Sequence, residues 1–381
     1  MKLFKSLLVA PATLGLLAPM SATANELNLA EVSGYSSSEE VQNISEFYPK
    51  ELAVTNSRLD GLEVRINEIE AGSFSETTTA SFSTDFYFGG VDGGTDATAD
   101  PFMLTYGFQI DLNTSFTGED SLDISLDAGN TATATTGVTE FDGNATADSV
   151  DVDGVSYTFP LGGATAFVAD NGDASALFTT ACTYGGPSNT LDDCGNVNAG
   201  PISGGTAAGA SYDFGNGFTV ATGMQTSQQV LTEESLDGVA LNAAYTGESY
   251  GVSLTYSSVE SSITEEDTAT AINAYYTPEG LPSISVGYET VDIGGAASTV
   301  DEKESVFLGL TWDEVGAGSL GVAVGYSNIV EGSEEEYMYE AYYSYPINDG
   351  MTITPLVFVK ENATSGLDNS TGVMVKTSFS F

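Results

Sequence analysis

The sequence predicts an all-β protein, a sixteen-stranded antiparallel transmembrane β-barrel, and three observations support this prediction. Apolar residues occupy every second position in segments from residue 73 to the end, which is the period of a half-buried strand. The connections between these segments alternate between short and long, as they do at the two ends of a transmembrane barrel. The last segment ends on Phe381, where an aromatic ring suits the membrane interface. A soluble β-sandwich shows the same alternation but has no reason to sort its loops by length.

The first 24 residues predict a cleaved secretory signal. Lys2 and Lys5 precede a short apolar run, and an A-x-A cleavage site ends at Ala24. No other apolar run is long enough to cross a bilayer as a helix. We therefore expect an exported chain whose mature part begins with a polar lead-in over residues 25–47.

A short periplasmic helix is predicted over residues 48–72. Pro49 suits a first helical turn, and Gly72 suits the position after a helix end. Residues spaced alternately three and four positions apart form the seam of a short coiled coil. They are Leu52, Thr55, Leu59, Leu62, Ile66 and Ile69. We expect this helix to self-associate as a trimer. The alternative is a single amphipathic helix packed on the barrel or in its mouth.

The barrel is expected over residues 73–381, and its sixteen strands make the even number that a single-chain barrel requires. The expected strands are 74–88, 102–112, 121–128, 155–160, 163–169, 206–213, 217–224, 238–246, 250–258, 269–276, 283–290, 304–312, 318–327, 336–345, 350–359 and 372–381. A weaker candidate, residues 176–182, lies among Gly, Asn and Asp residues and is expected to be loop.

Short and long connections alternate strictly along this series. The short ones are expected near 113–120, 161–162, 214–216, 247–249, 277–282, 313–317 and 346–349. If the first strand runs outward from the periplasm, these are periplasmic turns and the longer connections are external loops. The last strand then runs inward and pairs with the first, and Phe381 lies at the periplasmic rim on the lipid face.

Aromatic residues close many of the apolar runs. Amphipathic rings at strand ends suit the headgroup level at both rims of a barrel. The residues concerned are Tyr245, Tyr256, Tyr276, Tyr288, Trp312, Tyr326 and Tyr345.

The chain is strongly acidic, with 54 acidic residues, 8 basic residues and no His. From Ser73 onward the ratio is 44 acidic to 3 basic residues. Such a surface repels nucleic acid and attracts cations. The 41% hydrophobic content and the many Tyr and Phe residues argue against disorder. Acidic segments such as 92–100 and 331–336 are expected to be solvated surface, with weak calcium binding as the alternative.

No catalytic, cofactor-binding or metal-binding constellation is found in the sequence. His, the commonest general base, is absent, and no G-x-S-x-G motif occurs. The two cysteines, Cys182 and Cys194, are expected to form a local disulfide in an exported chain. We therefore expect a protein that is not an enzyme and needs no cofactor or metal.

The parity of the strands predicts which charged residues face the barrel interior. If the apolar face meets lipid, the opposite face meets water. The pore-lining residues are then Asp85, Asp111, Asp123, Asp213, Glu289, Glu340 and Lys376, and Lys376 is the only basic residue expected there. Interior charge of one sign favours ions of the other sign, so we expect a preference for cations. The alternative is that the acidity only keeps the surface soluble.

Four segments resemble cyanobacterial outer-membrane porins, which are grouped with the carbohydrate-selective porin family. They are the opening residues 1–12, the helix segment 53–61, the segment 156–162, and the motif Tyr-Tyr-Ser-Tyr-Pro followed by Ile-Thr-Pro over 342–355. The likeness runs nearly from end to end through short motifs. Family members typically carry an S-layer-homology domain before the coiled-coil helix. Here 36–47 leads almost directly into that helix, so the chain resembles a short form without the domain, and wall anchoring is not carried over.

The resemblance implies an outer-membrane porin for passive diffusion of small hydrophilic solutes and ions. It also implies a homotrimer in contact with outer-membrane lipid and with no nucleic-acid partner. In general porins that resemble this chain the third external loop folds inward and narrows the pore. Here that loop is the longest, about 170–205, and its disulfide would stiffen a constriction or, alternatively, only order an external loop. A sugar-preferring channel and a plugged structural or adhesive barrel are the alternative functions.

Overall fold

The computed structural model describes residues 78–93, 102–131, 140, 143–200, 203–227, 237–262, 265–294, 301–363 and 367–381. The expected signal sequence, lead-in and helix lie outside these residues, as do the seam residues Leu52, Thr55, Leu59, Leu62, Ile66 and Ile69. Among the described residues, none belongs to a helix with the length and apolar character needed to cross a membrane.

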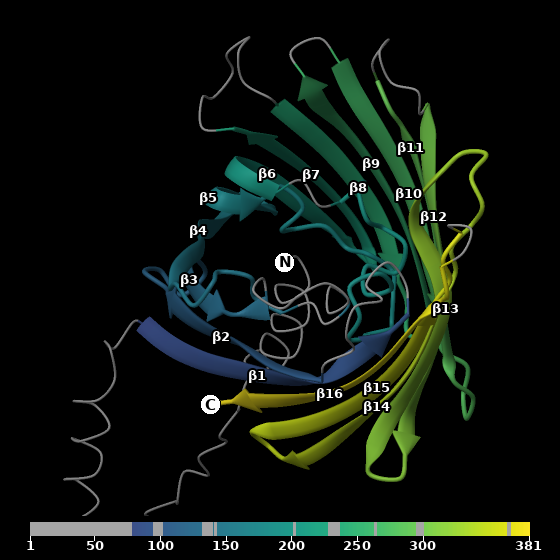
Figure 1. Ribbon diagram of the computed structural model, residues 1–381. Coiled ribbons are helices and arrows are strands. Elements are labelled where there is room, and N and C mark those ends of the chain that lie inside the picture. The colour runs from purple at the N-terminus through teal and green to yellow at the C-terminus, as the bar shows by residue number, and fades with distance from the viewer. Residues whose placement is uncertain are drawn as a thin grey trace, which may run out of the picture. The chain divides into compact units, whose positions relative to one another are not determined.

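Sixteen antiparallel strands form a closed barrel in which each strand pairs with its neighbours in sequence and β1 pairs with β16 (Figure 1). The strands are β1 Thr78–Asp92, β2 Met103–Thr114, β3 Ser121–Gly129, β4 Asp151–Leu161, β5 Ala164–Asp173, β6 Ser203–Gly215, β7 Phe218–Thr226, β8 Asp237–Thr246, β9 Tyr250–Ser262, β10 Glu265–Tyr276, β11 Ser283–Asp292, β12 Glu302–Val315, β13 Gly318–Val330, β14 Met338–Asn348, β15 Met351–Lys360 and β16 Ser370–Ser380. The number and order of the strands confirm the prediction, and residues 176–182 are not a strand, as expected.

Several strands extend further toward the long connections than their apolar pattern predicts. β1 continues to Asp92, which pairs with Thr371, and β4 begins at Asp151, which pairs with Asp127. These end residues are polar, so they carry no hydrophobic alternation. Backbone N–H and C=O groups still gain partners there, and the ladder therefore continues beyond the apolar band.

The barrel closes along β1 and β16, whose register runs from Ser83 opposite Ser380 to Asp92 opposite Thr371. On the outer face the ring of Phe82 stacks on that of Phe381, with 5.7 Å between the ring centroids. Phe381 is also joined to Phe82 by backbone hydrogen bonds. Cross-strand aromatic pairs of this kind stabilise a particular register. The structure confirms the predicted pairing of the last strand with the first.

Inner and outer faces alternate residue by residue around the barrel. On β15, Val357 is 53% exposed, whereas its neighbours Leu356 and Phe358 are each 2% exposed. On β1, Phe86 is exposed and Tyr87 is buried. Large apolar side chains thus cover the outside of the barrel, on the parity that the sequence predicts.

The short turn between β2 and β3 is closed by the carboxylate of Asp120. One of its oxygens accepts hydrogen bonds from Ser115 Oγ, the Phe116 N–H, and the N–H and hydroxyl of Thr117, at 2.7–2.9 Å. The other accepts the Tyr157 hydroxyl at 2.7 Å. Desolvation opposes ionisation, but the hydrogen bonds outweigh it and hold the pKa of Asp120 well below its usual range.

Replacing Asp120 with Asn should lower the unfolding temperature of the barrel at pH 7, because the amide cannot accept all these hydrogen bonds. A carboxyl whose pKa is lowered by folding stabilises the fold above its unfolded pKa of about 4. That contribution is lost as the pH falls below this value, so the difference between variant and wild type should shrink at about pH 3. Thermal unfolding at both pH values measures this, with Glu119→Gln as the control. An equal difference at both pH values would contradict the role of the charge.

Candidate functional site

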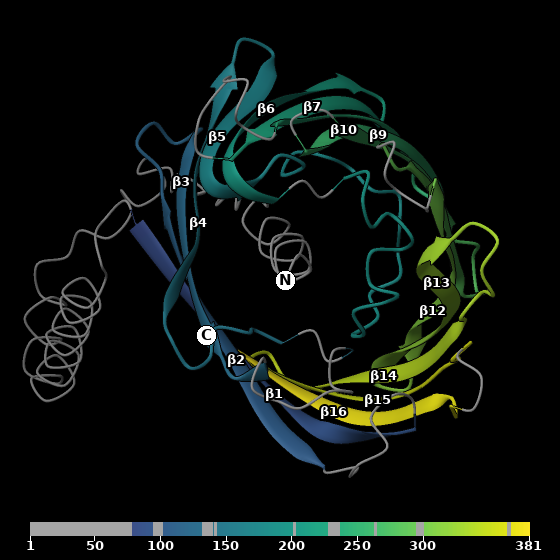
Figure 2. The same cartoon turned by 45° about the horizontal axis from the view of Figure 1, so that its top comes forward.

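Residues 174–200, called the interior loop here, follow β5 and lie inside the barrel along the wall from β7 to β14 (Figure 2). Three alternate N–H groups of the loop donate to side chains of this wall. Thr179 donates to Asn242 Oδ1 at 3.0 Å on β8, and Ala181 donates to Ser253 Oγ at 2.9 Å on β9. Thr183 donates likewise to Ser285 Oγ of β11. The predicted inward folding of the longest loop is confirmed.

The returning half of the interior loop is held by an amide and a carboxylate. On β10, Asn273 Nδ2 donates to the carbonyl oxygen of Cys194 at 2.7 Å. On β11, the buried Glu289 accepts the N–H groups of Asn198 and Ala199 at 2.7 Å, and also the Asn198 side-chain amide. Hydrogen bonds to an ionised acceptor are stronger than those between neutral groups. Glu289 therefore faces inward as predicted, but the loop covers it.

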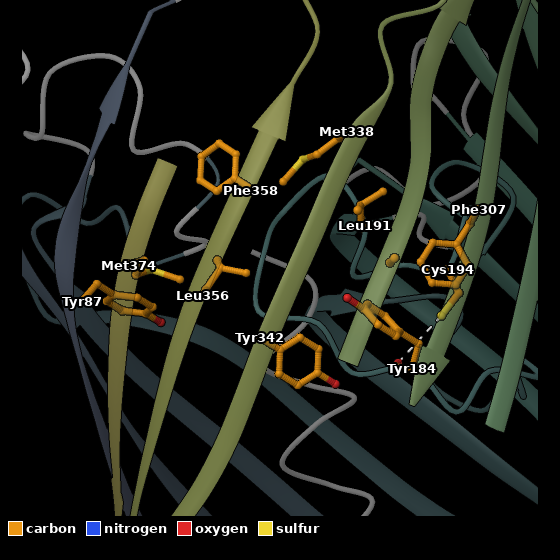
Figure 3. Packing of buried hydrophobic residues seen from close by; sticks show 11 residues of the cluster. Tyr87, Tyr184, Leu191, Cys194, Phe307, Met338, Tyr342, Leu356, Phe358 and Met374 are labelled. Atoms are coloured by element: carbon orange, nitrogen blue, oxygen red, sulfur yellow. Dashed lines mark hydrogen bonds between the residues drawn. The ribbon is translucent and has the colours of Figure 1, made fainter. Parts of the chain in front are cut away.

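A second covered carboxylate, Glu340 of β14, accepts the hydroxyl of Tyr184 at 2.5 Å. Burial, together with this carboxylate, raises the pKa of Tyr184 well above its usual value, so the hydroxyl stays protonated and donates. The ring of Tyr184 packs against Phe307 and Tyr342, with centroid distances of 5.2 and 5.6 Å (Figure 3). Polar and apolar contacts thus hold the same point of the loop.

An apolar cluster continues this contact across the wall toward the barrel seam. Leu191 of the interior loop belongs to it, together with Met338, Leu356 and Phe358 of β14 and β15 and Met374 of β16 (Figure 3). All of these side chains are buried. The interior loop is therefore fixed to the wall by a hydrophobic core as well as by hydrogen bonds.

Cys182 and Cys194 form a disulfide within the interior loop, with 6.4 Å between their Cα atoms. The predicted disulfide is thus present. It closes a segment that carries both Tyr184 and Leu191, and it limits the conformations of the part of the loop that packs against the wall.

Two glycines of the wall allow the loop backbone to approach closely. A Cβ atom on Gly287 of β11 would lie 1.8 Å from the carbonyl oxygen of Cys194, and one on Gly223 of β7 would lie 1.8 Å from that of Ala174. No side chain fits at either position. Glycine within a strand often marks such an approach of another backbone.

Asp111 of β2 lies on the inner face, on the opposite parity to the exposed Leu104, and Asp123 of β3 lies on the same face, opposite Asn113 of β2. Asp111 accepts the Ser125 hydroxyl at 2.6 Å, and Asp123 accepts the Asn113 amide at 2.5 Å. Asp127, which the sequence analysis did not select, lies on the same face of β3 but is buried. The hydrogen bonds of the interior loop described above go to other strands, so Asp111 and Asp123 form a partly exposed acidic stretch of wall apart from it.

The remaining predicted interior residues differ in their surroundings. Asp213 is exposed near the end of β6 and accepts the N–H of Gly215 at 2.7 Å. Asp85 is buried and lies 3.3 Å from the ammonium group of Lys376. Facing inward is therefore not equivalent to facing water.

The prediction that Lys376 is the only basic residue inside the barrel is wrong. Lys360, at the end of β15, also faces inward and donates to Thr190 Oγ1 of the interior loop at 3.0 Å. Lys303 of β12 lies opposite Val291, which packs against the interior loop. The predicted strands 304–312 and 350–359 each stop one residue short of these lysines, because the apolar pattern ends there.

The second long connection, between β3 and β4, also reaches into the barrel. The carboxylate of its Glu140 accepts the N–H and the hydroxyl of Thr190 at 3.0 and 2.8 Å, and it lies 2.7 Å from the Lys360 ammonium. The backbone oxygen of Glu140 accepts the N–H of Asn189. Sequence reasoning missed Glu140, since an irregular loop has no periodicity that would place it.

Comparisons with known proteins identify the fold. No family model matches the sequence. An uncharacterized protein of Nostoc sp. strain PCC 7120 is 24% identical over 415 residues, which cover 90% of this chain and 72% of that protein. The high-pH structure of OprB from Pseudomonas putida is similar with a TM-score of 0.59 at 12% identity, over 80% of this chain and 94% of that one.

A mutant of the Rh. blastica porin gives a TM-score of 0.56 at 14% identity, over 80% of this chain and 100% of that one. At such identities the likeness shows the fold alone. The chain therefore has the closed barrel fold of bacterial porins.

Among the described residues, no three His, Cys, Asp or Glu side chains are grouped to hold a metal.

Replacing Gly287 with Ala should narrow the lumen. The new methyl group would lie 1.8 Å from the carbonyl oxygen of Cys194, so the loop must move away from the wall. The ion current through single barrels in a lipid bilayer should fall. Gly163→Ala is the matched control, since its Cβ would meet only the ring of Tyr212, at 3.2 Å. A folded Gly287→Ala barrel with the wild-type current would contradict the close approach.

Replacing both cysteines with Ser should make the current through the barrel fluctuate more. The disulfide holds residues 182 and 194 together in the folded loop, so its loss gives the interior loop more conformations. Single-barrel recordings of the Cys182→Ser, Cys194→Ser variant measure this, with reduced wild type as an independent comparison. Identical current noise in all three samples would show that the packing alone holds the loop.

Proposed function

We propose that the protein is an outer-membrane porin through which small hydrophilic solutes and ions diffuse passively, with a preference for cations. The outer face supports a place in lipid. Large apolar side chains are exposed on strands all around the barrel, for example Leu104 on β2, Leu241 on β8 and Val357 on β15. A soluble monomer rarely exposes apolar surface of this extent, whereas the lipid-facing band of a transmembrane barrel requires it.

The distribution of charge on the inner wall is the observation that carries the cation preference. Asp111 and Asp123 lie on the inner face of β2 and β3 and are partly exposed. No Lys or Arg occurs between residues 73 and 302, so no basic residue lies on any strand from β1 to β11. The interior loop makes its hydrogen bonds to strands from β8 to β15, and we propose that the path of the ions runs past Asp111 and Asp123. Fixed interior charge of one sign raises the local concentration of the opposite ion.

The inner aromatic residues favour ions and small polar solutes over a sugar-preferring channel. Phe167, Phe307, Phe358 and Tyr342 all face inward and are buried. A ring that is covered by other side chains cannot stack against a sugar. The interior loop uses these rings for packing, so they support its role in setting the width of the pore.

The remaining features of this proposal come from the resemblance to cyanobacterial porins. They are an outer-membrane location after signal cleavage and a homotrimeric assembly. The similarity to a Nostoc protein over 90% of the chain is in keeping with such an origin.

Purified protein in planar bilayers should show steady open conductance and, in a salt gradient, a reversal potential of the sign for cation preference. Replacing Asp111 and Asp123 together with Asn should reduce the permeability ratio of cations to anions several-fold, because two fixed charges leave the wall. Asp349→Asn, at an exposed turn, is the matched control. Anion preference of the wild type would refute the proposed selectivity, and a barrel without conductance would instead be a structural or adhesive protein.

A further inference from the structure

Two of the three basic residues of the barrel are each paired with a buried carboxylate. Lys376 of β16 lies 3.3 Å from Asp85 of β1, and Lys360 of β15 lies 2.7 Å from Glu140 of the second long connection. In both pairs the carboxylate is the more deeply buried partner. Its side chain is 6% exposed, against 22% for Lys376 and 37% for Lys360. The lysine side chains, and not the carboxylates, are thus the more accessible partners of the two pairs.

Other contacts hold each carboxylate beside its lysine. Asp85 accepts a hydrogen bond from the Tyr87 hydroxyl at 3.4 Å, and the ring of Tyr87 lies under the Lys376 ammonium, 5.4 Å from it. Glu140 is fixed by the N–H and hydroxyl groups of Thr190. Neither carboxylate depends on its lysine alone for its position.

We propose that Glu140 and Asp85 determine ion specificity by masking the positive charges of Lys360 and Lys376 from the pore. The proposal rests on the proposed porin function. A carboxylate with so little exposure cannot itself bind a passing cation, but it cancels the charge of the neighbouring ammonium group. The field that a distant ion meets is then close to that of a neutral pair. Without the mask, two ammonium groups would repel cations from the lumen.

Single and double variants of the Glu140 pair test the proposal through the sign of the change in selectivity. Glu140→Gln should unmask Lys360 and lower the permeability ratio of cations to anions about twofold, the size expected for one charge acting through water over roughly 10 Å. Lys360→Met should leave an unmasked carboxylate and raise the ratio. The double variant should return to the wild-type ratio, because it removes one charge of each sign.

Asp85→Asn, Lys376→Met and their double variant should repeat the same three results at the other pair. This second pair guards against an effect of loop displacement, since Asp85 and Lys376 lie on adjacent strands and not on a loop. Single-barrel conductance is recorded in parallel, because a displaced interior loop changes conductance for every variant in which a contact is lost. Reversal potentials in a salt gradient provide the selectivity.

Opposite shifts in the two single variants, cancelled in the double variant, would support masking. Shifts of the same sign in both single variants, or a double variant as altered as either single one, would overturn it and assign the pairs a structural role. The proposed function is tested separately by the wild-type reversal potential. The signs expected for the variants are the same whichever ion the wild type prefers.

Discussion

Closure of the sheet between β1 and β16 is the constraint on which the rest of the structure depends. Every strand needs backbone partners on both sides, and a closed barrel provides them without leaving an edge. The pairing of Ser83 with Ser380 and of Asp92 with Thr371 fixes the register at the seam. A slip of one residue would turn the outward Val373 and Val375 inward and expose Met374 to lipid. Closure therefore decides which side chains can line a pore at all.

Backbone enters the interior only where the wall supplies hydrogen-bond partners for it. The interior loop brings unpaired N–H and C=O groups into the barrel, and the polar inner face of β8–β11 satisfies them through Asn242, Ser253, Asn273 and Glu289. An orphaned backbone group would cost as much as a lost hydrogen bond. The same polar parity that elsewhere faces water is used here to bind a loop. The inner wall thus has a part that binds the interior loop and, on β2 and β3, an acidic part with the partly exposed Asp111 and Asp123.

The fold was predictable because it follows from periodicity, but the division of the inner wall was not. The apolar alternation and the loop lengths predict all sixteen strands and their order. Two cysteines in an exported chain predict the disulfide. The parity of the strands correctly predicts that Glu289 and Glu340 face inward, but it does not predict which residues cover them. Contacts between residues far apart in sequence, such as Tyr184 with Glu340, decide that. Lys360 was missed because strand pairing continues past the last apolar residue.

The buried carboxylates also explain why a strongly acidic barrel keeps lysines on its inner face. An ionised group taken out of water costs several kcal/mol unless a partner compensates it, and removal of the partner is strongly destabilising. Asp85 and Glu140 are buried, and each lies beside one of these lysines. On this argument Lys360 and Lys376 compensate the charges of the buried carboxylates at the seam and at the loop contact, and they do not attract anions. The partly exposed Asp111 and Asp123 are then free of the opposing charge of these two lysines.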